Sequence, residues 1–333
     1  MINTILQHNL KMYPLKFEPT LKQTLWGGDK IITFKKLNNP TIGVGESWEL
    51  SGMENNESIV ANGVYKGYTI TEMLRKHREE LVGEANYARF GNQFPLLIKF
   101  IDAKQDLSIQ VHPTDDLAKK YHNSNGKTEM WYVVEADKEA KLRVGFSKQI
   151  TPKEYKEHIH NNTITDVLQE YEIGKGDVFF LPAGRIHSIG AGTFIAEIQQ
   201  TSDITYRIYD FNRKDTNGKP RELHTDLARE AIDYEVLTDY RTKYESIANE
   251  PVELAACSYF TTSVYDITEE ISCDYSELDS FVIFICIEGA CQLTDNEKNE
   301  ITLHSGETVL LSATTQEITI TPNSAVKLLE TYI

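Results

Sequence analysis

Short apolar segments alternate with turns rich in glycine, proline and polar residues along most of the chain. Within these segments apolar and polar side chains often alternate with a period of two, which is typical of strands that bury one face. Other segments, such as VFFL (178–181), TFIAEIQ (193–199) and FVIFICI (281–287), are almost continuously apolar, as in strands buried on both faces. The pattern predicts a mainly β fold.

Three segments break this pattern and predict helical insertions between the strands. They lie at about residues 69–92, 151–168 and 219–245. In the first, Ile70 and Leu74 belong to an apolar stripe with helical spacing, and either Thr69 or Thr71 could be the N-cap. The second opens with a Thr-Pro pair, a common helix start.

One predicted strand carries an unusual polar face. Ser108, Gln110 and His112 are spaced two residues apart, so they project from one side while apolar residues occupy the other. Lys127 and Glu129 repeat this spacing just before another apolar segment. A glutamine, a histidine and a glutamate are therefore expected to meet on one interior surface.

A later histidine, His187, follows a buried strand segment and a Pro-Ala-Gly turn. With Gln110, His112 and Glu129 it completes a set of nitrogen and oxygen donors of the kind that zinc accepts. The alternative is that Gln110 and His112 line a solvated strand face and that His187 caps a loop. The same alternation at several separate places favours a metal site with an open position for water or substrate.

The motifs resemble those of the type I mannose-6-phosphate isomerases, metal-dependent cupin enzymes, in their shorter bacterial form. They are LWGG (25–28), GESWELS (45–51), QVHP (110–113), KTE (127–129), FFLPAGRIHSIGAG (179–192) and TYRIYDFNR (205–213). The resemblance covers nearly the whole chain. It implies a cupin jelly-roll β-barrel that binds one zinc ion through Gln110, His112, Glu129 and His187.

The same resemblance assigns roles to four further residues. Arg207 falls on the position of the catalytic arginine of the family, and Lys99, Ser108 and Lys127 fall in the substrate cleft. Periodicity alone leaves other roles open. Arg207 could instead form a salt bridge on the exterior, and Lys99 could be a solvated lysine at a strand end. Trp26 is expected, like Trp48, to be a packing anchor.

The segment from Pro251 to the C-terminus repeats the central strand pattern without its ligands. Aligning Gly176-Asp177 with Gly306-Glu307 places Glu317 opposite His187, and separately aligning EMWYVVEA (129–136) with VIFICIEG (282–289) places Val282 opposite Glu129. This faint internal repeat indicates two β-sandwich or jelly-roll units, of which only the first is expected to bind metal.

We therefore predict a catalytic cupin domain at residues 1–248 and a degenerate, metal-free cupin-like domain at residues 249–333. All four cysteines lie in the last quarter of the chain and form no C-x-x-C pair, so we assign them no chemistry. His158 and His160 cannot easily share a metal, since positions two apart on a helix point in nearly opposite directions.

Composition limits the possible partners. The 34 basic and 50 acidic residues give a net charge of −16, which disfavours nucleic acid and anionic membranes. The first residues lack a secretory signal, and no segment has the ~18 consecutive apolar residues of a membrane span. We expect a cytoplasmic monomer or weak homodimer that binds a small sugar phosphate.

The expected activity is interconversion of mannose 6-phosphate and fructose 6-phosphate through a metal-stabilised enediolate. The catalytic base stays open among Lys127, a metal-bound water, Asp210 and Glu49. Two alternatives are a non-catalytic sugar-phosphate sensor on the same scaffold and, less favoured, an iron-dependent cupin oxygenase.

Overall fold

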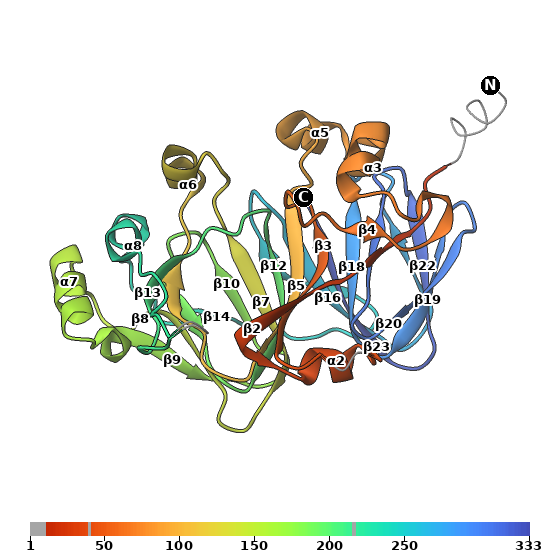
Figure 1. Cartoon of the computed structure of the whole chain (residues 1–333). Helices are drawn as coiled ribbons and strands as arrows, with labels where there is room; N and C mark the ends of the chain where they lie inside the picture. The colour runs from red at the N-terminus through yellow and green to blue at the C-terminus, as the bar shows by residue number, and fades with distance from the viewer. Residues whose placement is uncertain (1–10, 39–40, 215–217) are drawn as a thin grey trace. The chain divides into compact units, whose positions relative to one another are not determined.

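The computed structural model describes residues 11–38, 41–214 and 218–333, and most of its regular structure is β-strand (Figure 1). The described chain packs as two compact units. The first unit comprises Pro19–Met53 and Leu96–Lys243; the second comprises Glu54–Pro95 and Tyr244–Ile333, together with the described residues up to Glu18. Both are built mainly from antiparallel sheets, so the mainly β prediction is confirmed.

This grouping differs from a single division at residue 248, because two early segments pack with the C-terminal strands. Leu15 and Lys16 pair with Leu310 and Val309 in an antiparallel ladder. The ring of Phe94 lies against that of Phe281, with centroids 4.9 Å apart. These contacts join residues far apart in the sequence.

Two antiparallel sheets form the first unit. The larger has the order β14-β10-β7-β12-β5-β2-β3, with β14 Arg241–Thr242, β10 Val178–Leu181, β7 Glu129–Ala136, β12 Thr193–Gln200, β5 Leu96–Ala103, β2 Thr20–Gly28 and β3 Val44–Ser51. The smaller has the order β13-β6-β11-β8-β9, with β13 Tyr206–Tyr209, β6 Ile109–Val111, β11 His187–Ile189, β8 Lys141–Phe146 and β9 Leu168–Glu172. Trp131 and Ile195 of the larger sheet share an apolar core with Leu142 and Ile189 of the smaller.

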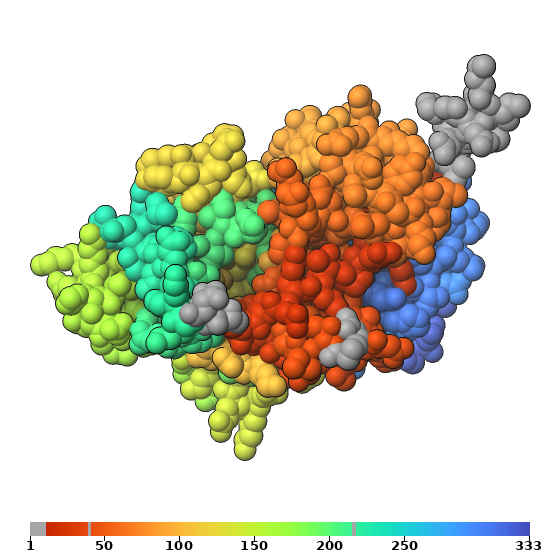
Figure 2. Space-filling model, viewed as in Figure 1, coloured from red at the N-terminus to blue at the C-terminus, as the bar shows by residue number. Residues whose placement is uncertain are grey.

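Helices cover the other face of the smaller sheet. They include α7 (Pro152–His160) and α8 (Thr225–Ala231), and Figure 2 shows them as adjoining lime and teal surfaces. Tyr155 of α7 and Ala228 of α8 pack in one buried cluster with Ile109 and Val111 of β6. The apolar side of β6 is therefore buried under helices, which leaves Gln110 on the side of the barrel interior.

The remaining helices of the first unit are short. They are α2 (Lys30–Phe34), α6 (Asp115–His122) and the 3-10 turn η3 (Ile164–Val167). In the segment 219–245 only α8 is helical. Beyond it, Asp233 donates its backbone N–H to the carbonyl of Gly184, and Tyr240 donates its hydroxyl to the carbonyl of Phe146, so this stretch bonds to the barrel instead of to itself.

Two glycines of the LWGG and GESWELS motifs allow β2 and β3 to approach closely. A Cβ atom on Gly27 would overlap the carbonyl oxygen of Gly43, and one on Gly45 would overlap Thr24 and the ring of Trp26. The motif glycines thus bring Trp26 and the adjoining part of β3 together on the barrel wall.

The second unit contains the sheets β15-β16-β23-β18-β21-β1-β4 and β17-β22-β19-β20. Their bounds are β1 Leu15–Glu18, β4 Ile59–Val60, β15 Pro251–Ala256, β16 Thr261–Ile267, β17 Ile271–Asp274, β18 Val282–Glu288, β19 Ala290–Asp295, β20 Glu300–His304, β21 Thr308–Leu311, β22 Glu317–Pro322 and β23 Val326–Tyr332. Its helical elements are η2 Gly63–Tyr65, α3 Ile70–His77, α4 Glu79–Val82 and α5 Glu84–Phe90. Thr69 caps α3 in a capping box with Glu72.

The strand registers of the two units correspond at the aligned positions. Glu129 pairs with Leu181 in the first unit, and Val282 pairs with Leu311 in the second. An apolar valine thus occupies the sheet position of the glutamate. Glu317, aligned with His187, is exposed to solvent.

Candidate metal centre and active site

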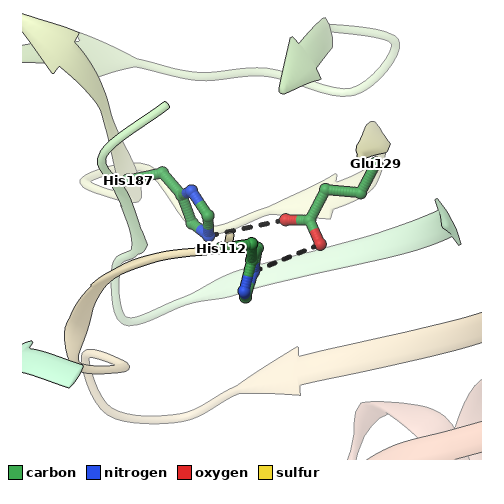
Figure 3. A group of neighbouring side chains, drawn as sticks. All are labelled: His112, Glu129 and His187. Atoms are coloured by element: carbon green, nitrogen blue, oxygen red, sulfur yellow. Dashed lines mark ion pairs between the residues drawn. The ribbon is translucent and has the colours of Figure 1, made fainter. Parts of the chain in front are cut away.

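Three buried side chains from separate segments of the chain meet at one point of the first unit. Glu129 begins β7, His187 begins β11, and His112 follows β6. Their candidate ligand atoms all lie within 4.8 Å of one another, and Figure 3 shows the two imidazoles directed at the two carboxylate oxygens. The Nε2 atom of His112 is 3.4 Å from Oε2 of Glu129, and that of His187 is 3.5 Å from Oε1.

Backbone carbonyls orient both imidazoles. The Nδ1 atom of His112 lies 2.9 Å from the carbonyl oxygen of Ile204, and that of His187 lies 2.8 Å from the carbonyl oxygen of Arg185. When Nδ1 carries the proton and donates it to a carbonyl, the lone pair of the ring is on Nε2. In both histidines the Nε2 atom faces Glu129. Metal-binding histidines are commonly held in this way.

Three atoms of this group are buried without a hydrogen bond among the described residues. They are Nε2 of His112 and both carboxylate oxygens of Glu129. Because an unsatisfied buried polar atom is costly, a bound cation would compensate all three. The group therefore fits a divalent metal, with a neutral imidazole on each side of a carboxylate.

Gln110 is the fourth predicted ligand and lies next to this group. It is opposite His187 in the β6–β11 ladder, and its Nε2 atom is 3.2 Å from Nε2 of His187. In this orientation the amide donates to the imidazole. Rotation of the carboxamide would present its oxygen, the atom suited to a metal.

The local charges hold each group in a metal-binding form. Burial, reinforced by the Lys127 ammonium, lowers the pKa of His112 to about 4. Burial likewise lowers the pKa of His187. Burial opposes ionisation of Glu129, but Lys127 and the imidazoles outweigh it and hold the pKa of that carboxyl well below its usual value. Neutral imidazoles and an ionised carboxylate are the forms that bind metals.

The four predicted catalytic and substrate-binding residues gather at a hollow in the same unit. Its volume is about 190 Å³, and Lys99, Ser108, Lys127 and Arg207 all line it, together with Gln110. The Lys127 ammonium is 3.0 Å from Oε2 of Glu129, which connects the hollow to the metal group.

Arg207 is half-buried and lies opposite Gln110 in the β6–β13 ladder. Its Nη1 donates to the carbonyl oxygen of Glu222 at 3.0 Å, whereas its buried Nε has no hydrogen-bond partner among the described residues. Burial and the neighbouring Arg221 lower the pKa of this guanidinium. The side chain thus lies in the hollow with donor capacity still free.

Sequence reasoning missed three carboxylates that line the hollow, those of Glu46, Glu197 and Asp203. Glu197 accepts a hydrogen bond from the indole of Trp131 at 2.9 Å and lies 3.4 Å from the Lys99 ammonium. Glu46 accepts from the indole of Trp48 at 2.6 Å. A signal was present, since Glu197 is a lone charge in a fully buried strand. Trp48 proves to be both a packing residue and part of the lining.

The two acidic candidates for the catalytic base are engaged elsewhere. Glu49 forms an ion pair with Lys35 at 2.7 Å, and Asp210 is held by Arg213 and Arg221. Neither carboxylate lines the hollow. Lys127 does line it, and although burial disfavours its charge, Glu129 and Glu197 outweigh burial and raise its pKa.

The four cysteines are free thiols, and the metal group found in the described part of the chain does not include His158 or His160. None of the described helices is long and apolar enough to span a membrane.

Known proteins resemble this chain over both units. The family model for the phosphomannose isomerase type I catalytic domain matches residues 14–172, and that for the mannose-6-phosphate isomerase cupin domain matches residues 252–329. Mannose-6-phosphate isomerase ManA of Bacillus subtilis is 35% identical over 85% of this chain and 88% of its own length. A mannose-6-phosphate isomerase of Streptococcus mutans is 37% identical over 66% of this chain and 67% of its own length. The crystal structure of the mannose 6-phosphate isomerase from Bacillus subtilis has a TM-score of 0.87 and 30% identity, covering 97% of this chain and all of that one.

Proposed function

Because the chain belongs to the type I phosphomannose isomerase family, we propose that it interconverts mannose 6-phosphate and fructose 6-phosphate. The predicted resemblance and cupin fold class are confirmed by the same matches. The observation that carries the proposal is the buried group of His112, Glu129 and His187 beside a hollow lined by Arg207 and Lys127. Neither the sensor nor the iron oxygenase alternative is favoured by the relatives.

The proposed metal is zinc, held by His112, Glu129, His187 and the amide oxygen of Gln110. Two imidazoles, a carboxylate and an amide are acceptable zinc donors, and the hollow next to them leaves access for a substrate oxygen. When bound, the ion would polarise the sugar carbonyl and stabilise the charge that develops on the C1 and C2 oxygens.

Arg207 has the complementary role on the same oxygens. Its guanidinium lines the hollow beside Gln110, and its Nε–H has no acceptor among the described residues. A fixed cationic donor at this position stabilises an enediolate more strongly than the neutral sugar, which is what lowers a barrier.

Lys99, Ser108 and Lys127 are the proposed contacts for the phosphate. All three line the hollow, so they supply positive charge and a hydroxyl in a protein that is acidic overall. A phosphorylated sugar does not cross membranes freely, and the proposal therefore places the protein in the cytoplasm.

A coupled assay tests this proposal. The zinc-loaded protein is incubated with mannose 6-phosphate or, in parallel, glucose 6-phosphate, and fructose 6-phosphate is measured. We expect turnover with mannose 6-phosphate that stops on chelation and returns with zinc. Turnover that survives complete removal of metal, or none with the metal-loaded protein, would refute the proposal.

A further inference from the structure

The second unit contains a pocket that the isomerase proposal does not use. Its volume is about 370 Å³, and it opens between β16, β17 and β23. Tyrosine rings form much of its wall, from Tyr265, Tyr275 and Tyr332, together with the side chain of Leu278. All of its lining residues belong to the C-terminal strands and their connections.

A buried carboxylate lies in this pocket. Glu330 is only 4% exposed, and its Oε1 atom accepts hydrogen bonds from the hydroxyls of Tyr265 (3.4 Å) and Tyr275. Neither of these two hydroxyls bonds to its other oxygen, Oε2. Donation by two hydroxyls favours the ionised carboxylate, whereas burial raises the pKa of this carboxyl.

Strand register shows why this carboxylate has no cationic partner on the neighbouring strands. Glu197 lies opposite Trp131 in the first unit, and Glu330 lies opposite Phe284 at the corresponding position of the second. Glu197 also lies opposite Lys99, whose ammonium is 3.4 Å away, but the residue opposite Glu330 is Ser263. The second unit thus retains the buried carboxylate and lacks the lysine.

The rest of the lining does not replace that lysine. The residues around the pocket include Asp274 and Cys273 but no lysine, arginine or histidine within the described chain. Burial also raises the pKa of the Cys273 thiol to about 11, so it stays neutral at physiological pH. The pocket therefore combines two carboxylates, the buried Glu330 and Asp274, with tyrosine rings.

We propose that this pocket is a second binding site, which takes a small organic cation with its ammonium group against Glu330. A buried carboxylate is stabilised electrostatically by a cation in direct contact with it. Aromatic rings attract the same charge through their electron-rich faces, and tyrosine-lined pockets suit quaternary ammonium groups. The surroundings disfavour an anion such as a sugar phosphate, which would face Glu330 and Asp274.

Isothermal titration calorimetry of the full-length, zinc-loaded protein tests this site with choline as the probe. The control ligand is 3,3-dimethylbutan-1-ol, which has the shape of choline without its charge. We expect saturable binding of choline and at least about tenfold weaker binding of the neutral analogue, since only choline interacts electrostatically with the carboxylate. Equal affinity for the two ligands, or no saturable binding of choline, would overturn the proposal.

Three variants locate the site. Glu330→Gln keeps the shape and removes the charge, and it should weaken choline binding at least about tenfold. Ser263→Lys supplies the ammonium that Lys99 provides in the first unit, and it should weaken choline binding similarly. Glu300→Gln changes an exposed glutamate of the same unit and should bind like the wild type. Unchanged binding in Glu330→Gln or Ser263→Lys would contradict the assignment.

Discussion

Oε1 of Glu129 lies 3.5 Å from Nε2 of His187, and this buried oxygen has no hydrogen-bond partner among the described residues. A carboxylate oxygen and an imidazole lone pair do not attract each other directly. Both are stabilised when a cation lies between them, and His112, just after β6, approaches the same point. This relationship is the structural basis for the metal site.

Removing His187 should therefore remove the metal. His187→Ala is expected to reduce zinc from about one ion per chain to a small fraction, because the site loses one of its donors. Elemental analysis after dialysis measures the content. His160→Ala, at an exposed helical histidine, is the matched control and should retain its zinc. Full occupancy in His187→Ala would show that the ion binds elsewhere.

Arg207→Ala should separate catalysis from metal binding. We expect the turnover number to fall by roughly 10²–10³, the usual effect of losing a donor to a developing oxyanion, while zinc content is unchanged. Arg229→Ala on α8 is the control for loss of a partly exposed arginine. Wild-type turnover in Arg207→Ala would remove this residue from the mechanism, and loss of zinc would make it a structural residue.

The stability of the metal-free protein should fall on acidification. The pKa of His112 is about 4 in the folded state, against about 6.5 in an unfolded chain. Between these values the unfolded chain binds the proton first, so this histidine contributes stability above pH 6.5 that is lost as the pH falls towards 4. The contribution is on the order of 3 kcal/mol.

Urea unfolding at several pH values between 4 and 7.5 measures this effect. His112→Gln removes the titrating ring, and its stability should vary less steeply across the same window. If the free energy of unfolding of His112→Gln varied with pH in parallel with that of the wild type, His112 would not be held neutral by the fold.

Trp131 should stabilise the folded protein through a hydrogen bond as well as through packing. It is fully buried, and its indole donates to Glu197 at 2.9 Å, so Trp131→Phe leaves a buried carboxylate oxygen without a donor as well as a cavity. Relative to Trp26→Phe in the same core, we expect an additional loss of about 1–3 kcal/mol in the free energy of unfolding. Equal losses in urea unfolding would show that the hydrogen bond to Glu197 has no net effect.

Local spacing explains which features were predictable. Strand alternation has a period of two, so the interior face of β6, with Gln110 followed by His112, could be inferred from a few neighbouring residues. The mainly β class followed from the same alternation repeated along the chain. The ordered motifs added the functional class, which periodicity alone cannot supply.

Long-range contacts explain what could not be predicted. The carbonyl that orients His112 belongs to Ile204, 92 positions later in the chain, and no local pattern indicates it. Pairing of β1 with β21 likewise assigns an N-terminal strand to the second unit. In residues 233–245, bonds to the barrel replaced the helix that the spacing of apolar residues favoured.

The most direct test of the metal centre is anomalous diffraction at the zinc edge from crystals of the zinc-loaded protein. Our interpretation predicts one strong peak in the first unit, within about 2.0–2.2 Å of donor atoms from Gln110, His112, Glu129 and His187. A peak that these four residues do not surround, or none in a protein that turns over mannose 6-phosphate, would contradict it.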